Sequence, residues 1–494
     1  MISPYRLARR AIRIFVMAFA AILTLPVGVQ PTVTTLLKDG RVLMTSDPNF
    51  HAEIYDRDPR SWSERLIGRL RGDRPPSLEA AMGPQETLHA VLFDPATEGF
   101  SYTGAMAALK QDYNSLVLPN GRVIFTGGRK LGPNDPAPAP ESFDPETGKF
   151  ETIESLRGLT AYCTPTLLQD GKVLMVGGFG RPADPAVVYD PSTGRAKVVG
   201  RPLQNRLNPV TVLLKNGKVL IFGGSSSAEL YDPHSESFSS AGNFPDNWAP
   251  SSAMTLRDGR VLIVGSQGGA GEHAVVPPQD VEEIYDPVSG KLVPTPHTMV
   301  ARWNPLTAML KDGTVLLVGG YGNPKSNWPS RSLDSAEIYD PDDNAFRETG
   351  GLPPELADFR GNGNEKLTPL QNGQVLYTAF PSPHPYTAAL YDPVSGTFET
   401  LEGMSYAAGP VAELKDGRVL LFPLGMAGGY GSMGTHMTGI QASSMAQELS
   451  KTALIFNPKN RIFESIPVCL TEPASWTRTI HNLLTDDRRP PSGR

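Results

Sequence analysis

One short motif occurs eight times along the chain and restricts the folds open to it. Each copy has an apolar run, one further residue, Asp-Gly or Asn-Gly, and a second apolar run, as in LLKDGRVLM at 36–44. The glycines of the eight copies are Gly40, Gly121, Gly171, Gly217, Gly259, Gly313, Gly373 and Gly417. The first interval is 81 residues, and the later ones are 42 to 60 residues. Periods of this size indicate a propeller, a solenoid or another repeat array.

Each copy of the motif predicts a β-hairpin. Asp-Gly between two apolar runs is the strongest short hairpin signal, because a tight primed turn requires positive φ at both central residues. The second strand, for example residues 173–176, is apolar on both faces. This is the pattern of a strand buried between two sheets, so we expect each hairpin to pack between neighbouring repeats.

A second motif closes each repeat. Its eight copies begin with the aromatic residues Phe93, Phe143, Tyr189, Tyr231, Tyr285, Tyr339, Tyr391 and Phe456, each followed by Asp-Pro or Asn-Pro. The aromatic residue ends a third strand, the next pair starts a turn, and a fourth strand follows. Eight four-stranded units in a radial array form a β-propeller, which leaves few sheet edges exposed. We therefore expect an all-β propeller of eight blades, with seven as the alternative if a terminal unit is degenerate.

The paired motifs resemble kelch repeats, particularly the bacterial kind, over about residues 32–466. The resemblance implies a kelch-type propeller, similar in fold to the central domain of galactose oxidase. Kelch proteins include cytoskeletal and substrate-adaptor proteins, sugar-acid epimerases and copper radical oxidases. The resemblance therefore implies a fold whose loops bind something, and it does not select one function.

Two terminal segments and one insertion lie outside the regular repeats. Within residues 1–31, four arginines precede the uncharged run 14–25, which is the order of a signal peptide or an N-terminal membrane anchor. Residues 46–88 interrupt the first blade. Residues 467–494 form either a strand that closes the ring or an irregular tail. We expect an exported protein, located in the periplasm, in the cell envelope or outside the cell.

Charge and motif content restrict the partners. The formal net charge is −6, and beyond residue 30 it is 41 − 51 = −10. A chain of this sign is a poor partner for nucleic acid. Two cysteines, Cys163 and Cys469, form no disulfide framework. The chain contains no HExxH, GxxxxGK[ST] or GxSxG motif. We expect a monomeric binding protein rather than an enzyme, without a cofactor or a bound metal.

The connections after each second strand and the links between repeats are expected on one face, where loops carry function on a rigid scaffold. Aromatic and arginine side chains there can stack on sugar rings or anchor a peptide. The predicted ligand-binding residues are Tyr162, Trp248, Trp303, Trp328, Arg360, Tyr406 and His436. Arg206 and Arg302, each ten residues before a turn Asp or Asn, are interpreted instead as structural ties between adjacent blades. The ligand we expect is a glycan or a protein.

An oxidase resembling galactose oxidase is the alternative. In that family a cysteine near the start of a first strand is linked to a tyrosine of the next repeat, which follows an Arg-x pair. Cys163 matches the cysteine, but Asn208 occupies the tyrosine position, and no Tyr-His dipeptide is present. The copper-radical residues of the family are therefore incomplete. Sugar-acid epimerase activity is a further alternative, although those proteins are typically six-bladed.

Overall fold

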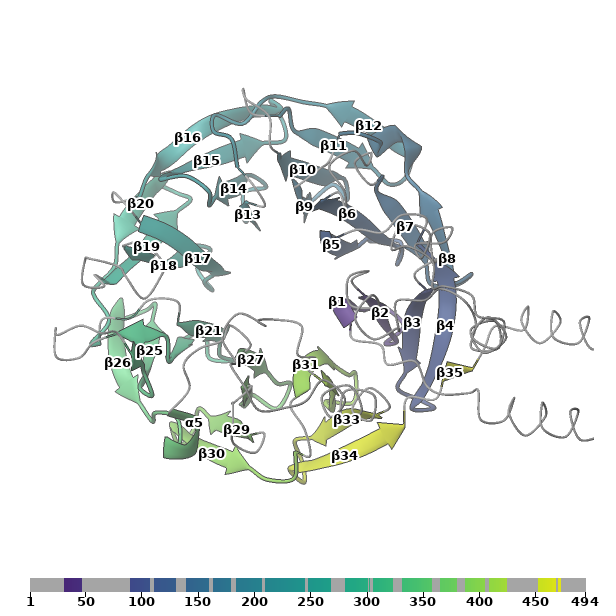
Figure 1. The fold of residues 1–494 in the computed structure, drawn as a ribbon. Helices are drawn as coiled ribbons and strands as arrows, with labels where there is room; N and C mark the ends of the chain where they lie inside the picture. The colour runs from purple at the N-terminus through teal and green to yellow at the C-terminus, as the bar shows by residue number, and fades with distance from the viewer. Residues whose placement is uncertain are drawn as a thin grey trace, which may run out of the picture.

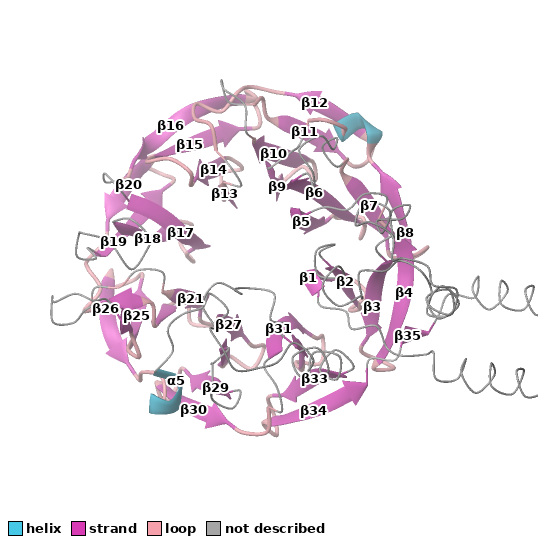
Figure 2. Ribbon diagram, viewed as in Figure 1, coloured by secondary structure: helices cyan, strands magenta, loops and turns pink. Residues whose placement is uncertain are grey.

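The computed structural model describes residues 31–46, 89–106, 111–129, 139–159, 163–178, 184–206, 209–244, 248–267, 280–300, 302, 305–322, 331–357, 365–379, 387–404, 408–423, 452–467 and 470–471. These residues form eight four-stranded antiparallel sheets arranged in a ring (Figure 1). Apart from the strands, they contain one 3-10 turn, η1 (Glu154–Leu156), and one short helix, α5 (Pro354–Ala357) (Figure 2). Neither described helix is long and apolar enough to cross a membrane.

The blades follow one another in chain order. The first four contain β1 (Pro31–Leu36), β2 (Val42–Ser46), β3 (His89–Asp94) and β4 (Gly99–Ala105); β5 (Gln111–Val117), β6 (Val123–Arg129), β7 (Glu141–Asp144) and β8 (Lys149–Thr152); β9 (Cys163–Leu167), β10 (Val173–Gly177), β11 (Val187–Asp190) and β12 (Arg195–Val198); and β13 (Val210–Leu213), β14 (Val219–Phe222), β15 (Ser227–Asp232) and β16 (Ser237–Asn243).

The next four contain β17 (Trp248–Thr255), β18 (Val261–Gln267), β19 (Asp280–Asp286) and β20 (Lys291–Pro294); β21 (Leu306–Met309), β22 (Val315–Val318), β25 (Ala336–Asp340) and β26 (Ala345–Thr349); β27 (Lys366–Pro369), β28 (Val375–Ala379), β29 (Thr387–Asp392) and β30 (Thr397–Leu401); and β31 (Ala408–Glu413), β32 (Val419–Pro423), β33 (Thr452–Asn457) and β34 (Ile462–Pro467). The first strand of each blade lies nearest the ring axis and the fourth lies on the outside (Figure 1). The fold is an eight-bladed β-propeller, as the repeats predict.

The core of the propeller lies between blades. The described residues form eight apolar clusters, and each joins one blade to the next. The second strands fill these clusters from both sides; in β14 and β22 every residue is buried. Because burial of one large apolar side chain contributes about 1.5 to 3 kcal/mol, these strands supply much of the folding free energy.

The Asp-Gly and Asn-Gly turns form hairpins, but their geometry differs from the primed turn predicted above. In the first blade the amide of Gly40 donates to Leu37 O at 3.0 Å, and the amide of Leu37 donates to Arg41 O at 2.9 Å. Only the glycine has positive φ, +98° at Gly40, so the hairpin has three loop residues and a glycine bulge. In all eight turns the Asp or Asn side chain accepts a hydrogen bond from the amide two residues later. Because either side chain can accept this bond, both Asp and Asn are found at the position.

The Tyr-Asp-Pro motifs also have a common geometry. Each buried aromatic residue ends a third strand, and in six blades it packs on an aromatic residue of the fourth strand, as in Tyr391 and Phe398 with ring centroids 4.8 Å apart. The following Asp or Asn accepts a hydrogen bond from the amide two residues later in all eight copies. The motif therefore closes the blade with a turn that needs no tertiary partner.

The ring closes without exchange of a blade strand. The first blade takes all four of its strands from residues 31–105, and an apolar cluster joins it to the eighth blade. After β34 the short strand β35 (Leu470–Thr471) pairs in parallel with β4, with Leu470 opposite Phe100. At the same junction Arg418 forms an ion pair with Glu98 at 2.5 Å. Residues 472–494 and the segments 1–30 and 47–88 lie outside the described residues, so the prediction for 467–494 stays a prediction beyond this two-residue strand.

Candidate functional site

The two faces of the ring carry different kinds of connection. All the turns between first and second strands, and between third and fourth strands, are tight turns on one face, which we call the turn face. The connections between second and third strands and the links between blades lie on the opposite face, which we call the loop face. Longer connections are therefore confined to the loop face, which is the arrangement expected for a binding surface on a rigid scaffold.

Arg206 lies in the link between the third and fourth blades and contacts both of them on the side of the loop face. Its guanidinium Nε donates to Glu229 Oε1 at 2.8 Å, Nη1 donates to Gly223 O at 2.8 Å and Nη2 donates to Ser227 O at 2.7 Å. Gly223 and Ser227 bracket the second connection of the fourth blade. The carbonyl oxygen of Arg206 accepts from the amide of Gly178 in the third blade at 2.9 Å. Arg206 therefore ties two adjacent blades together.

Arg302 repeats this arrangement between the fifth and sixth blades. Its Nη2 donates to Glu337 Oε1 at 2.5 Å, and Nη1 donates to Gly319 O and Ser335 O, both at 3.0 Å. The other oxygen, Glu337 Oε2, accepts from the amide of Met299 in the link at 2.7 Å. The link before the sixth blade thus contacts the carboxylate of Glu337, and the connection after the second strand contacts the guanidinium of Arg302.

Both arginines and both glutamates are buried, each with 1% of its surface exposed. A buried ion pair contributes little net stability compared with apolar residues, but loss of one partner leaves an unpaired charge and costs about 3 to 5 kcal/mol. The two pairs therefore fix geometry and are not available to a ligand. The prediction of a tie between adjacent blades is confirmed for Arg206, whereas the contacts of Arg302 tie the link to the sixth blade.

The glutamate partners were not predicted, although the sequence contains a signal for them. Glu229 and Glu337 stand two residues before the tyrosine of Tyr-Asp-Pro, in AELYD and AEIYD. The position is apolar in four repeats, for example Val187 and Ala389, and a charged residue at such a site is usually buried only with a partner. Pairing it with an arginine of the preceding link required the tertiary structure.

The sixth blade carries an additional hairpin on the loop face. Its strands β23 (Tyr321–Gly322) and β24 (Arg331–Ser332) pair antiparallel, with Tyr321 opposite Ser332. The backbone oxygens to which Arg302 Nη1 donates, those of Gly319 and Ser335, lie on either side of this hairpin in the sequence. The buried pair therefore anchors the base of the hairpin to the blade.

Most of the predicted ligand-binding residues lie outside the described part of the chain: Tyr162, Trp303, Trp328, Arg360, Tyr406 and His436. Trp248 is the first residue of β17, where its backbone is paired with Gln267. Trp303 directly follows Arg302 in the sequence, and Trp328 belongs to the segment between β23 and β24. In the sixth blade, two predicted ligand-binding residues therefore lie next to described residues in the sequence.

Cys163 does not fit the copper site of the oxidase alternative. It is the first residue of β9, it is 2% exposed, and it belongs to a cluster with Leu118, Ile124 and Leu156 of the second blade and the segment after it. The oxidase linkage requires the cysteine to meet the residue at position 208, which leads into the fourth blade. Next in the strand, Thr164 faces that way and donates to Pro209 O at 2.7 Å. Because alternate strand residues point to opposite faces, Cys163 points away from Pro209 and toward the second blade.

The rest of the described chain adds no alternative metal centre. Within it, no three His, Cys, Asp or Glu side chains are grouped so that they could hold a metal ion. Cys163 takes part in no disulfide, and Cys469 lies outside the described residues.

The fold resembles that of many solved structures, whereas comparison by sequence finds no match, either to a family model or to a curated protein. One of these structures is a fungal alcohol oxidase of the AA5 family in complex with copper, with 16% sequence identity and a TM-score of 0.41. The alignment covers 82% of this chain and 95% of that chain.

Proposed function

We propose that this chain is an exported kelch-type propeller that binds a glycan or a protein through its loop face and catalyses no reaction on it. The observation that carries the proposal is the anchored hairpin of the sixth blade. A buried Arg302–Glu337 pair fixes the link before the blade and the two residues, Gly319 and Ser335, that flank the hairpin in the sequence. Such an anchor holds a binding surface in place before the ligand arrives, which reduces the entropy lost on binding.

The chemistry of the adjoining segments supports a binding role. Trp303 and Trp328 are large, amphipathic side chains that need few rotatable bonds to make a large contact, and tryptophan dominates binding hot spots. Stacking of an indole on a sugar ring or its insertion into a protein pocket uses the same property. Export is supported by the basic and then apolar order of residues 1–31.

The test is a glycan array combined with a pull-down from envelope extract, using the exported protein. We expect one of the two to give a ligand, and Trp328→Ala and Trp303→Ala to weaken its binding about tenfold or more, as a hot-spot residue does. The matched control is Val394→Ala, because Val394 is 97% exposed on the opposite, turn face. The proposal fails if both assays are empty, or if the control weakens binding as much as the tryptophan variants.

Export has a separate test that does not depend on the ligand. Cells expressing the full chain are fractionated, and the mass of the protein in each fraction is measured. We expect it in the envelope or periplasmic fraction or in the medium, either shortened at the N-terminus or retained at the membrane. Full-length protein confined to the cytoplasm would contradict this part of the proposal.

A further inference from the structure

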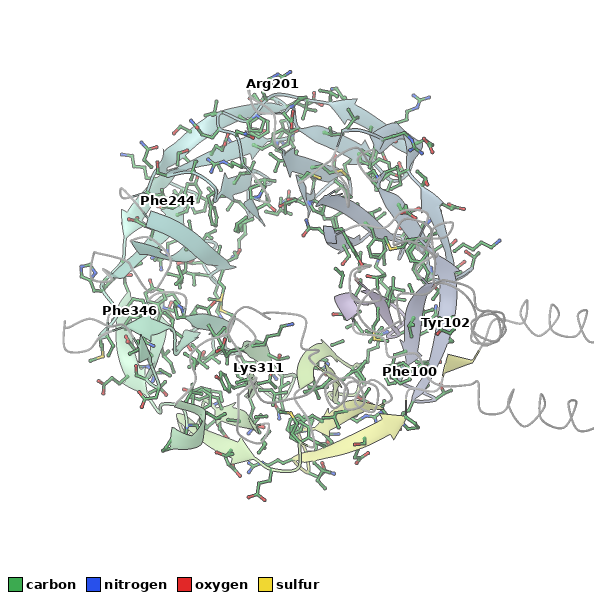
Figure 3. All side chains as sticks on the ribbon, viewed as in Figure 1. Phe100, Tyr102, Arg201, Phe244, Lys311 and Phe346 are labelled. Carbon is green, nitrogen blue, oxygen red and sulfur yellow. The ribbon has the colours of Figure 1, made fainter. Side chains whose placement is uncertain are left out.

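A ring of cationic side chains surrounds the propeller axis on the turn face. It is formed by the residue two positions before each turn glycine, and we call this set the inner turn ring: Lys38, Pro119, Gln169, Lys215, Arg257, Lys311, Gln371 and Lys415. Five of the eight are cations, and all five are exposed. Figure 3 labels Lys311 on the axis side of the ring, near β27. A chain whose body has a net charge of −10, from 41 − 51, thus concentrates positive charge at one place.

The side chains of the inner turn ring connect neighbouring turns in sequence. Lys215 Nζ donates to Arg257 O at 2.5 Å, Arg257 donates in turn to Lys311 O, and Lys311 donates to Gln371 O. Lys415 Nζ closes the circle by donating to Lys38 O at 2.7 Å, and Lys38 donates to Pro119 O. The five cations are therefore held in fixed positions by the repeat geometry.

The aliphatic stems are held as well as the charged ends. A Cβ placed on Gly259 would lie 3.0 Å from Cδ of Lys215, and one placed on Gly40 would lie 3.0 Å from Cδ of Lys415. Each stem thus crosses the turn glycine of the next blade at close range. Long side chains usually lose rotamer entropy when they bind a ligand, and here part of that loss has occurred in folding.

The connections between turns do not require charge. Gln169 Nε2 donates to Lys215 O at 3.1 Å, which is the contact that the cations make, and Gln371 Nε2 reaches the adjacent carbonyl of Leu414, also at 3.1 Å. Pro119 has no side-chain donor. Like charges gathered around one axis repel each other, so five cations in the ring disfavour its closure. The positive charge therefore needs an explanation other than ring closure.

The cations of the inner turn ring differ from the next cations outward. The residue after each turn glycine is cationic in six blades, and each of these six pairs with a carboxylate: Arg41, Arg122, Lys172, Lys218, Arg260 and Arg418. Within the described chain, none of the five inner cations makes such an ion pair; they donate to neutral backbone oxygens. The positive charge of these five side chains is therefore not neutralised by a described carboxylate and can attract an anionic ligand.

The charge of the inner turn ring affects the ionisation of a neighbouring carboxylate, that of Asp39. Burial opposes ionisation of Asp39, but hydrogen bonds from Arg41 and the charges of Arg41 and Lys415 outweigh it and lower the pKa of Asp39 below its ordinary value. Farther from the axis, seven of the eight turns between third and fourth strands begin with Asp. A positive centre inside a negative rim favours an anion small enough to fit at the centre over a long polyanion lying across the face.

We propose that the inner turn ring is a binding site for a compact, multiply charged oxyanion. An ammonium group has three donors and the structure uses one on a backbone oxygen, so each lysine keeps donors for the ligand. Oxygens of phosphate, sulfate or clustered carboxylates supply the matching acceptors. The site is on the face opposite the loop face, and so it is independent of the proposed function.

The experiment measures binding of inorganic tripolyphosphate to the full chain by calorimetry at low salt. The ring variant is Lys38→Gln/Lys215→Gln/Lys311→Gln, which copies the glutamines that already connect turns at 169 and 371. The matched control is Lys149→Gln/Lys291→Gln/Lys459→Gln, which removes three charges from the outer turns of the same face. We expect the ring variant to lose about tenfold or more in affinity and the control to stay within about twofold of the wild type.

A charge-preserving variant separates loss of charge from loss of fold. Lys38→Arg/Lys215→Arg/Lys311→Arg is expected to bind tripolyphosphate like the wild type, and affinity in all binding variants is expected to fall as salt is raised. Citrate and a sulfated disaccharide identify which oxyanion binds best. The proposal is overturned if the wild type binds none of the three probes, if the ring variant and its control weaken equally, or if the arginine variant weakens as the glutamine variant does.

Discussion

Arg302 and Glu337, 35 residues apart in sequence, form an ion pair of 2.5 Å in which both side chains are buried. The pair joins the link before the sixth blade to the third strand of that blade. The same contact recurs in the fourth blade, where Arg206 meets Glu229 at 2.8 Å. Two blades of the propeller thus form an internal charge pair at a position that is apolar in four other blades and is Glu141 or Glu283 in the remaining two.

Removal of one partner should destabilise the protein strongly. We expect Glu337→Gln to lower the free energy of unfolding by about 3 to 5 kcal/mol, because Arg302 is left buried without a counter-charge. Chemical denaturation measures the change. Arg157→Gln is the control: its pair with Glu154 is exposed on both sides, so a much smaller change is expected. A loss at Glu337 no larger than at Arg157 would contradict a structural role for the buried pair.

Glu283 occupies the same position in the fifth blade and should behave in the opposite way. It is 6% exposed, and burial raises the pKa of its carboxyl above the ordinary value of 4.5. The unfolded chain ionises first as pH rises, so this group lowers stability above the unfolded pKa and has no effect below it. Glu283→Gln should therefore increase the free energy of unfolding at pH 7, on the ordinary scale of about 1 kcal/mol. The gain should vanish at low pH.

Measurement of unfolding free energy against pH for wild type and Glu283→Gln tests this sign. A variant that is less stable than the wild type at pH 7 would show that the Glu283 carboxylate is stabilised in the folded protein. Comparison with Glu337→Gln is the internal control, because the substitution is identical and the strand position is the same.

The turns between third and fourth strands provide a test of backbone strain. The fifth residue of each turn has positive φ, and it is Gly in four blades and Glu98, Glu236, Asn344 or Arg461 in the others. Gly290 has φ of +69°, and a Cβ there would meet no atom within 4 Å. Gly290→Ala should lower the free energy of unfolding by about 1 to 2 kcal/mol through strain alone.

Gly290→Asn is the matched variant, because Asn adopts the left-handed conformation more readily and Asn344 already occupies the equivalent turn. We expect it to cost less than half as much as Gly290→Ala in chemical denaturation. Equal losses for the two variants would show that crowding, and not backbone conformation, determines the effect.

The environment of Cys163 predicts its reactivity. Its thiol is buried between the second and third blades, so a thiol reagent should reach it only when the protein unfolds. In a Cys469→Ser background, we expect no labelling of the native protein and one thiol per chain in denaturant. A thioether to tyrosine would remove the thiol permanently, so absence of labelling in denaturant would instead favour the oxidase alternative.

The ring and its blade number could be predicted from sequence because they depend on local patterns. The Asp-Gly and Asp-Pro pairs specify turns through bonds within two residues, as the contact from Asp39 to the amide of Arg41 shows. Apolar residues on both faces of strands such as Val219–Phe222 then require burial between sheets. The turn type was predicted less well, because the glycine bulge and the primed turn both accept the same dipeptide.

The site could be predicted only in part, because its key contacts join residues that are distant in sequence. The sequence alone indicated that Arg206 and Arg302 are structural, but their glutamate partners lie 23 and 35 residues away and meet them through blade packing. Likewise, Lys38 and Lys415 are separated by 377 residues and become neighbours only when the ring closes. Repetition in the sequence determined the fold, since each turn and strand is specified locally. The tertiary structure decided that positive charge gathers on the turn face, because ring closure places equivalent residues of the eight blades around one axis.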